Sequence, residues 1–323
     1  METGQILLTG GAGYIGSHVN KLLSEKGYQT IVFDNLSRGH TELVKWGELL
    51  EGCLSNTSTL DNLFKHNNIS CVMHFAAYAY IGESIEKPGD YYANNVSNTI
   101  NLLNVMIANK VNNIIFSSTC ATYGVPDTLP ITENTEQKPI NPYGRSKLMV
   151  ETILADYTNA YGLNHVNLRY FNAAGCDPDG EIGEMHEPEP HLIPIAINAC
   201  MNDSYLEIYG DDYNTKDGTC IRDYIHVSDV ADAHYKALEY LDNYKSDSFN
   251  IGLGYGHSIL DIIECIEKLL KKKIKKKIMK RRFGDPPELF TSNTKACNAL
   301  NWKPNYTNIS DIIQSAIDWM NQR

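Results

Sequence analysis

The sequence predicts an α/β protein with a doubly wound parallel sheet and a smaller mixed α/β lobe. From residue 5 to about 170, short apolar runs rich in β-branched residues alternate with amphipathic helical patterns. After residue 172 this rhythm gives way to a proline-rich loop and mixed short elements. With 323 residues, 42% of them hydrophobic, the chain can bury a core of that size, which excludes a disordered or fibrous protein.

The expected strands of the sheet are the apolar runs Gln5–Thr9, Thr30–Phe33, Cys71–Phe75, Asn113–Ser117 and His165–Arg169. After the first strand, Val19, Leu22 and Leu23 fall on one face of a helix, and Gly27 is placed to end it with a left-handed cap. Strands and helices that alternate in this way are typical of a Rossmann-type fold.

The second half of the chain has a less regular pattern. A loop containing Asp177–Gly180 and three prolines leads to an expected strand over Ile221–Val227 and to helices near 229–240, 258–271 and 308–321. We expect a first domain over residues 1–172, to which segments near 221–256 return. An interleaved lobe over 173–323 would then lie near the carboxyl ends of the strands, where such folds bind ligands.

The charge of the chain is unevenly distributed. Its 28 basic and 39 acidic residues give a net charge of −11, but ten of the basic residues lie between Lys268 and Arg282. The remaining 308 residues hold 18 basic against 39 acidic residues, a net charge of −21. Such a surface repels nucleic acid and anionic membranes. Because the basic tract contains no aromatic residue for base stacking, we interpret it as a solvated helix end and strand leading to Arg282.

The eight cysteines are scattered, and neighbouring ones are at least 18 residues apart, so no zinc or redox spacing is present. Reduced thiols fit a cytoplasmic protein. The chain also lacks an apolar stretch of 18 residues and the pattern of a signal peptide, so we expect it to be neither exported nor membrane-spanning.

A glycine-rich turn follows the first expected strand directly. Gly10, Gly13 and Gly16 have the spacing that allows a tight turn, close approach of a pyrophosphate and packing of helix on strand. Asp34 ends the second strand 21 residues after Gly13, where a carboxylate can bind the ribose hydroxyls of NAD and repel a 2′-phosphate. These features favour NAD. Arg38 lies nearby and could bind a 2′-phosphate, so NADP is the weaker alternative. A different alternative is that the glycines only form turns and bind no cofactor.

A tyrosine and a lysine lie one turn apart at the start of a predicted helix. Tyr143 and Lys147 follow Asn141-Pro142, a helix-start signal. A phenol has a pKa of about 10, so Tyr143 could act as a base only beside positive charge, which Lys147 and a nicotinamide cation can supply. Thr119, at the end of the Asn113–Ser117 strand region, could bind the same substrate hydroxyl. A surface helix pair is the alternative for an isolated Tyr-x-x-x-Lys pattern.

These features together resemble the extended short-chain dehydrogenase/reductase family, and within it the UDP-sugar 4-epimerases. The resemblance covers essentially the whole chain, and its last segment is the most specific because simple dehydrogenases of the superfamily lack it. The matching segments are Gly10–His18, Asp34–Ser37, His74–Ala77, Gly82–Ser84, Tyr91–Val96, Tyr143–Glu151, Arg169–Asn172 and Asp217–Val227.

The resemblance implies reversible epimerisation at carbon 4 of UDP-galactose and UDP-glucose through a transient 4-keto sugar, with NAD bound throughout. It implies that Tyr143 is the base and that Thr119 contacts the substrate. Lys147 would bind the ribose of the cofactor and lower the pKa of Tyr143. The implied cofactor contacts are Gly10, Gly13, Tyr14, Ile15, Gly16, Asp34, Asn35, Leu36, Ser37, Arg38, Gly39, Leu54, Phe75, Ala76, Ala77, Tyr78, Ala79, Asn94, Tyr143, Lys147 and Phe171.

The implied nucleotide-sugar contacts include two arginines, Arg222 and Arg282, that suit bidentate binding of a pyrophosphate. The full set is Thr119, Tyr143, Asn172, His191, Leu192, Glu207, Ile208, Tyr209, Arg222, Arg282 to Asp285, and Leu289. Relatives pair through helices equivalent to those around 88–108 and 143–161, so the resemblance also implies a homodimer. It further implies a role in galactose metabolism.

Three positions depart from the family pattern. Cys53 stands where many relatives have an aspartate facing the adenine, and Ala79 replaces a lysine found in some relatives near the cofactor phosphates. Leu289 stands where a tyrosine restricts the sugar pocket and a smaller residue admits N-acetyl sugars. Leucine is intermediate in size, so acceptance of N-acetyl sugars stays open.

Other functions share parts of this pattern with epimerisation. A 4,6-dehydratase or decarboxylase on the same scaffold needs an acid or an added polar group beside Thr119, and Thr119–Thr122 contains no carboxylate. A UDP-N-acetylglucosamine 4-epimerase stays open, whereas an inactive NAD-sensing regulator would not need both Tyr143 and Lys147. Met185–His191 holds two histidines and two glutamates, but without helical spacing we expect a loop over the substrate and no metal.

Overall fold

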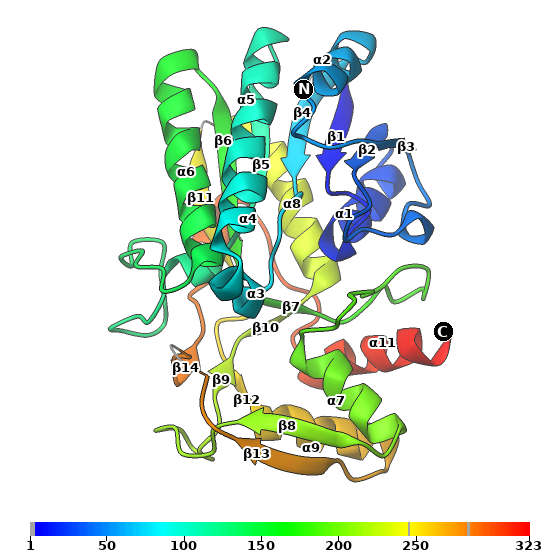
Figure 1. Cartoon of the computed structure of the whole chain (residues 1–323), viewed down its shortest axis with the longest axis vertical. Coiled ribbons are helices and arrows are strands. Elements are labelled where there is room, and N and C mark those ends of the chain that lie inside the picture. Colours follow the sequence, from blue (N-terminus) through cyan, green and yellow to red (C-terminus); the bar gives the residue numbers. More distant parts are fainter. Residues whose placement is uncertain (1–3, 245, 283–284) are drawn as a thin grey trace.

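The centre of the computed structural model, which describes residues 4–244, 246–282 and 285–323, is a seven-stranded parallel sheet (Figure 1). The five predicted strands all lie in it, with boundaries within two residues of those expected, so the Rossmann-type fold is confirmed. In spatial order the strands are β11 (Asp247–Ile251), β6 (Asn164–Tyr170), β5 (Asn113–Thr119), β4 (Ile69–His74), β1 (Gln5–Thr9), β2 (Thr30–Asp34) and β3 (Glu48–Glu51).

The two outer strands, β3 and β11, were not predicted. β3 extends the sheet beyond β2, and its sequence of two leucines between two glutamates suits an edge exposed to water. β11 pairs in parallel with β6, so that Phe249 lies opposite Leu168 although the two residues are far apart in the chain. β11 lies within the segments near 221–256 that were expected to return to the first domain, but local patterns do not identify the strand or its long-range partner.

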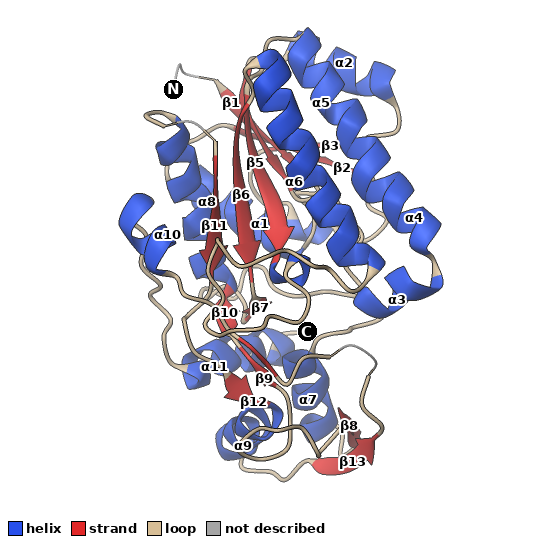
Figure 2. Cartoon of the chain, turned by 90° about the vertical axis from the view of Figure 1, so that its left-hand side faces the viewer, coloured by secondary structure: helices blue, strands red, loops and turns tan. Residues whose placement is uncertain are grey.

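The inner strands of the sheet bury both faces, because helices cover the sheet on both sides (Figure 2). Ile6 and Leu8 belong to the core beneath α1 and α8, whereas Leu7 belongs to the core beneath α2, α5 and α6. The bounds of these helices are α1 (Tyr14–Glu25), α8 (Val227–Leu241), α2 (Thr57–His66), α5 (Asn98–Ala108) and α6 (Pro142–Tyr161). Between α2 and α6 the chain also forms α3 (Ile81–Glu86) and α4 (Pro88–Tyr92).

A second group of elements lies below the carboxyl edge of the sheet (Figure 1). It contains α7 (Leu192–Met201), α9 (Ile259–Leu270), α11 (Ile309–Asn321), the pair β8 (Tyr205–Tyr209) and β13 (Lys275–Met279), and the sheet β12 (His257–Ser258), β9 (Ile221–Arg222) and β14 (Glu288–Leu289). The remaining elements are β7 (Asn172–Ala174), β10 (Tyr224–His226) and α10 (Thr294–Ala299). Among the described residues, no helix has the length and apolarity needed to cross a membrane. The domain division at residue 172 stays a prediction.

The expected strand over Ile221–Val227 is wrong as a single element. The structure splits it into β9, which pairs with β12 and β14, and β10, which pairs with β7. The buried carboxylate of Asp223, between the two strands, accepts hydrogen bonds from the backbone N–H groups of Leu253 and Gly254 at 2.8 and 3.0 Å. These bonds connect Asp223, where the two strands separate, to the loop that follows β11.

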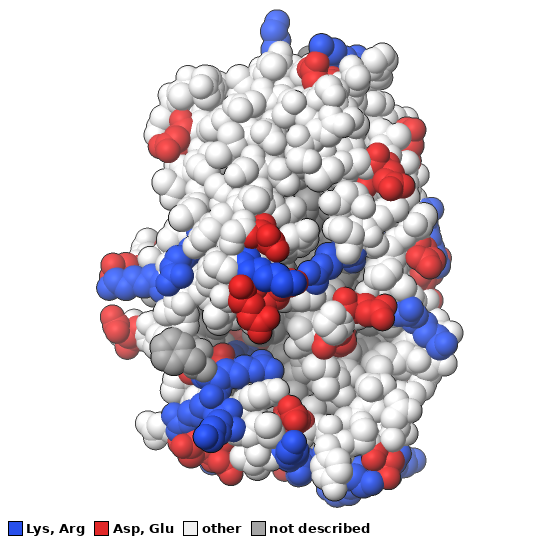
Figure 3. Space-filling view, in the orientation of Figure 1, with Lys and Arg blue, Asp and Glu red and all other residues white. Residues whose placement is uncertain are grey.

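The basic tract forms the end of α9 and the strand β13, as predicted. Lys273, Lys275 and Arg281 pair with the acids Glu267, Asp203 and Asp212, each at 2.5 Å. Basic and acidic side chains are accordingly interspersed over the lower lobe in Figure 3. Local acids therefore neutralise part of the tract.

Lys21 joins the sheet domain to the loop before α7. Its side chain is 7% exposed, and its ammonium lies 2.8 Å from the buried carboxylate of Asp177, 2.7 Å from Asp179 and 2.9 Å from Glu181. These carboxylates hold the pKa of Lys21 above its usual value despite burial, which by itself lowers it. The ammonium is thus a charged link between α1 and residues 177–181.

Replacing Lys21 by methionine is expected to lower the free energy of unfolding by about 3–5 kcal/mol, because Asp177 keeps its burial and loses its cation. Chemical denaturation measures this change. Lys65→Met is the control, since Lys65 pairs with Asp61 on an exposed helix face and such pairs contribute up to about 1 kcal/mol. Equal losses in the two variants would contradict the structural role of Lys21.

Candidate active site

One cavity of about 440 Å³ opens at the carboxyl edge of the parallel sheet. The ends of β1, β2, β4, β5 and β6 all contribute to its wall, and so do β9 and β14 from the second group of elements. Open α/β sheets bind ligands at this edge. The cavity therefore lies where the predicted cofactor and substrate residues meet.

The glycine-rich turn forms one end of the cavity. Gly10 has a φ of +73°, and a Cβ there would lie 2.4 Å from the backbone nitrogen of Ala76. A Cβ on Gly16 would lie 2.6 Å from the carbonyl oxygen of Gly10, so both positions require glycine. A Cβ on Gly13, by contrast, would approach only the Gly10 oxygen, at 3.4 Å. Gly13 therefore presents bare backbone at the start of α1, which suits a pyrophosphate.

Asp34 lies at the end of β2 and lines the same cavity. Its carboxylate accepts hydrogen bonds from the backbone N–H groups of Ala12 at 3.0 Å and Leu36 at 2.9 Å. Burial raises the pKa of Asp34, and these bonds oppose that rise. The carboxylate is thus fixed in place at the position expected for ribose binding.

Arg38 is already paired within the protein. Its Nη2 atom donates to both carboxylate oxygens of Glu83, at 2.8 and 2.7 Å, and its guanidinium lies 4.7 Å from the ring centre of Tyr80. A 2′-phosphate would have to compete with Glu83 for this cation. The pairing therefore weakens the argument for NADP.

Tyr143 and Lys147 project from the first two turns of α6. The side chain of Asn141 caps this helix by accepting a 2.8 Å bond from Gly144 N–H, and a Cβ on Gly144 would lie 2.5 Å from the carbonyl oxygen of Ala121. The start of α6 is therefore packed directly on the turn that follows β5. This packing places Tyr143 and Lys147 in the cavity wall with Thr119.

Burial opposes charge on both members of this pair. It raises the pKa of Tyr143 to about 12, although a hydrogen bond with Thr119 lowers it, and it lowers the pKa of Lys147 to about 7. The Lys147 amino group donates to the carbonyl oxygen of Ser117 at 2.8 Å. The three predicted catalytic residues are thus brought together at the end of β5.

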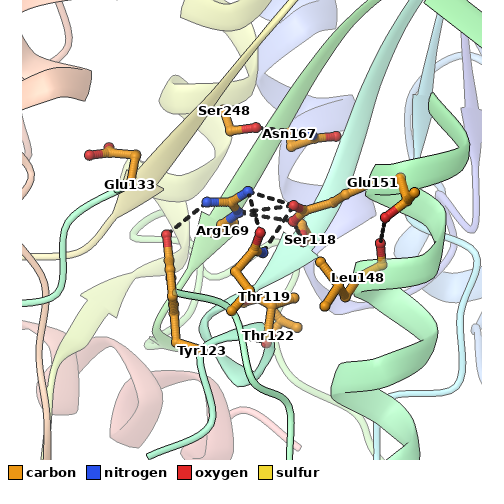
Figure 4. A network of polar contacts seen from close by, with 12 residues as sticks. Ser118, Thr119, Thr122, Tyr123, Glu133, Leu148, Glu151, Asn167, Arg169 and Ser248 are labelled. Carbon is orange, nitrogen blue, oxygen red and sulfur yellow. Dashed lines mark hydrogen bonds and ion pairs between the residues drawn. The ribbon is translucent and has the colours of Figure 1, made fainter. Parts of the chain in front are cut away.

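Behind them lies a buried polar network (Figure 4). The guanidinium of Arg169 on β6 contacts both carboxylate oxygens of Glu151 on α6, with distances of 2.6 to 3.1 Å, and donates to the Tyr123 hydroxyl at 2.8 Å. The hydroxyl of Ser118 on β5 also donates to Glu151. The network connects α6, β5 and β6 immediately behind the Tyr143–Thr119 contact.

The other end of the cavity is formed by β9, β14 and the start of β7. Arg222 donates to the carbonyl oxygen of Pro286 at 2.9 Å, and Asn172 donates to that of Asp223 at 2.9 Å. Leu289 is buried in a cluster with Cys120, Tyr123, Ile131 and Phe171. Of the predicted substrate residues, those that line the cavity are Thr119, Tyr143, Asn172, His191, Arg222, Asp285 and Leu289.

Some predicted contacts are not among the described residues that line the cavity. Leu36 instead holds Asp34 through its backbone. The Arg282 guanidinium lies 4.0 Å from the ring centre of Tyr209, whose hydroxyl donates to Glu207 at 2.9 Å, so these residues form a separate group. Ile208 is buried and Leu192 packs against the core, while Phe283 and Gly284 lie outside the described residues. The ligand contacts of all these residues stay predictions.

Other lining residues were not among the predicted contacts. The hydroxyls of Ser117 and Tyr170 are hydrogen-bonded at the ends of β5 and β6, where the convergence of parallel strands could have indicated them. Tyr80 and His186 come from loops without a local pattern. Among the predicted cofactor contacts, all except Leu36 line the cavity.

The loop that carries residues 75–80 is fixed by one asparagine. The side chain of Asn95, in the π-helical turn Ala93–Ser97, accepts from Tyr78 N–H at 2.8 Å and donates to the Tyr78 carbonyl oxygen at 2.9 Å. It also donates to Ser146 on α6 at 3.0 Å. The cofactor end and the Tyr143 helix are therefore held in one rigid arrangement.

This fold and this cavity define an enzyme that depends on NAD and acts on a hydroxyl group of a substrate linked to a nucleotide. The model of the NAD dependent epimerase/dehydratase family matches residues 6–252. The UDP-glucose 4-epimerase of Rhizobium meliloti (strain 1021) is 46% identical over 325 residues, which cover 100% of this chain and 99% of that protein. The chain therefore belongs to this family.

Solved structures agree with this assignment. The UDP-glucose 4-epimerase of Brucella ovis in complex with NAD has a TM-score of 0.94 and 48% identity, covering 97% of each chain. The UDP-Glc/GlcNAc 4-epimerase of Campylobacter jejuni has a TM-score of 0.87 and 40% identity, covering 99% of this chain and 100% of the other. The chain is an NAD-dependent nucleotide-sugar epimerase, and the predicted cofactor and reaction class are confirmed.

Replacing Gly13 by alanine tests the cofactor end. The fold should tolerate the added Cβ, since its nearest neighbour is 3.4 Å away, but the methyl group occupies the space where a pyrophosphate approaches the backbone. We expect an unchanged unfolding temperature of the NAD-free protein and at least about tenfold weaker NAD binding, or ~1.4 kcal/mol. The NAD released on denaturation measures retention. Gly89→Ala, on α4 with no neighbour within 4 Å, is the control, and equal NAD retention in both variants would contradict this role.

Proposed function

We propose that the chain interconverts UDP-galactose and UDP-glucose as a step in galactose metabolism. The observation that carries the proposal is the placement of Tyr143 and Lys147 beside Thr119, in a cavity that joins the Gly10–Gly16 turn to Arg222. The cavity provides for a dinucleotide at one end and a nucleotide sugar at the other. The similarity to UDP-glucose 4-epimerases along the whole chain supports the same substrates.

Each catalytic side chain has a defined role in the proposal. The Gly10–Gly16 turn and Asp34 would hold NAD, which when bound would supply hydride transfer from and back to carbon 4 of the sugar. The Tyr143 oxygen takes the proton from the 4-hydroxyl group and gives it back, while Thr119 binds the same hydroxyl. Lys147, held by the Ser117 carbonyl, binds the ribose and favours the tyrosinate.

The pKa of Tyr143 shows what the site must supply. Bringing a pKa of about 12 to neutrality corresponds to roughly 7 kcal/mol, at about 1.4 kcal/mol for each unit. Positive charge close to the phenol can provide stabilisation on that scale, and the hydrogen bond with Thr119 adds to it. Lys147 and the bound cofactor are the sources that the proposal assigns.

The dehydratase alternative has no observation in its favour. The polar network next to Thr119 contains the carboxylate of Glu151. This carboxylate is bound by Arg169 and Ser118, and Glu151 does not line the cavity. Acceptance of N-acetyl sugars is a separate matter, because the similar Campylobacter jejuni enzyme is named for both sugar types. Leu289, buried in the cavity wall, is the position that we propose to decide it.

A homodimer in the cytoplasm completes the proposal. The sequence of α5 carries no charged residue, and Met149 and Tyr161 on α6 are 45% and 57% exposed. The part of the surface over these two helices shows few charged side chains in Figure 3. All eight cysteines are free, which fits a reducing compartment. The mass of the pure protein in sedimentation equilibrium tests the pairing.

Tyr143→Phe tests the proposed base. Wild-type protein, incubated with UDP-galactose and no added cofactor, should form UDP-glucose and release NAD on denaturation. The variant should retain NAD and lose about a hundred- to ten-thousandfold in turnover, because general base catalysis contributes on that scale. Tyr161→Phe, on the exposed end of the same helix, should behave as wild type.

Near-normal turnover of Tyr143→Phe would rule out this residue as the base. A 4-keto-6-deoxy product from the wild type would indicate a dehydratase. Retained NAD without turnover would indicate a regulator.

Leu289→Tyr tests the sugar specificity. The larger ring should narrow the cavity and lower kcat/KM for UDP-N-acetylgalactosamine relative to UDP-galactose by about tenfold or more, the range of a steric difference in a pocket. Leu289→Met conserves volume and should leave the ratio near that of the wild type. A ratio unchanged by tyrosine would show that Leu289 does not control access.

A further inference from the structure

Four potential metal ligands converge in the loop between β7 and α7. The nearest ligand atoms of Glu184, His186, Glu189 and His191 all lie within 4.8 Å of one another. The Nδ1 atom of His191 lies 2.6 Å from Glu184 and 3.0 Å from Glu189, and that of His186 lies 3.0 and 3.7 Å from the same two residues. Two imidazoles and two carboxylates thus surround one point.

We propose that these four side chains bind a divalent transition metal ion, with Zn²⁺ as the ion that fits best. Two carboxylates balance the charge of a divalent cation, and two neutral imidazoles complete a four-coordinate set. Zinc bonds of about 2.0–2.2 Å place tetrahedral ligand atoms roughly 3.4 Å apart. The present nitrogen–oxygen distances of 2.6 to 3.7 Å bracket that spacing.

The surroundings hold the loop in this conformation. The indole N–H of Trp319 on α11 donates to the Glu184 carbonyl oxygen at 3.1 Å, and a ring nitrogen of His40 lies 2.5 Å from the carbonyl oxygen of Met185. The ring of Tyr14 meets that of His186 edge to face, with 5.9 Å between centres. The Glu184 side chain is only 7% exposed. The ligands are therefore preorganised by contacts outside the loop itself.

The position of the cluster gives the ion a consequence for the enzyme. His186 and His191 line the cavity, so an ion would tie the loop into a ring at the cavity wall. The sequence pattern argued against a metal because the histidines lack helical spacing. An irregular loop brings them together instead.

A second acidic group shows the contrast. Asp177, Asp179 and Glu181 also converge, but the ammonium of Lys21 lies within 2.9 Å of each. That group already holds a cation from the protein. In the Glu184 cluster the positive charge comes from the two imidazoles, because the carboxylates raise their pKa values against the effect of burial. A metal ion would take the place of those protons.

Titration of the chelator-treated, full-length protein with Co²⁺ tests the proposal directly. We expect one ion per chain, with the visible absorption of a four-coordinate nitrogen–oxygen site, and displacement by Zn²⁺. Zn²⁺ should also raise the unfolding temperature, because an ion that binds only the folded state stabilises it. Glu184→Gln and His186→Ala should each weaken binding at least tenfold and abolish this rise.

Matched variants make the test specific. Glu187→Gln removes a carboxylate from the same loop outside the cluster, and His66→Ala removes an exposed histidine on α2, so both should bind Co²⁺ as the wild type does. If His186→Ala does not fold, Glu189→Gln replaces it. The proposal is overturned if the wild type binds no Co²⁺, if the control variants lose binding as strongly as the cluster variants, or if a sulfur-to-cobalt band identifies a cysteine ligand.

Discussion

The buried ion pair between Glu151 and Arg169 is the constraint on which the geometry of the site depends. Their side chains are 5% and 7% exposed, so both charges are out of water and each needs the other. Lys147 lies one helical turn before Glu151, and Thr119 follows Ser118, which donates to the same carboxylate. The pair therefore fixes α6 against the ends of β5 and β6. Without it, the position of Tyr143 relative to Thr119 would depend on the packing of Gly144 on Ala121 and on the bond from Asn95 to Ser146.

The same burial that fixes the site also opposes charge within it. It shifts the pKa of Tyr143 upward and that of Lys147 downward, and Glu151 raises the Lys147 pKa only in part because Arg169 shares its charge. In the protein alone Tyr143 therefore favours its neutral form, whereas Lys147 is partly protonated near pH 7. Formation of the tyrosinate then depends on the charge of Lys147 and on positive charge that arrives with the cofactor. This couples proton abstraction to occupancy of the cofactor end.

Local patterns were sufficient for the centre of the fold and for the cofactor end of the site. The turn at Gly10, the acid at Asp34 and the Tyr143–Lys147 spacing are each encoded within a few residues, and their neighbours follow from the order of parallel strands. The pairing of β11 with β6 and the division at Asp223 depend on residues far apart in the chain. The convergence of Glu184 and His191 depends on a loop held by Trp319. Such tertiary effects have no local signal.

An acidic chain has to bind two ligands that carry phosphate groups, although its net charge repels them. Arg38 is paired with Glu83, and Arg222 donates to the Pro286 carbonyl oxygen, so neither cation is fully free to attract a phosphate. Residues 13–16 line the cavity at the start of α1, where the first backbone N–H groups of a helix have no intrahelical acceptors. We therefore propose that binding at the cofactor end rests on positioned N–H donors and close backbone approach more than on net charge. This explains how a chain of net charge −11 can bind a dinucleotide without a basic surface.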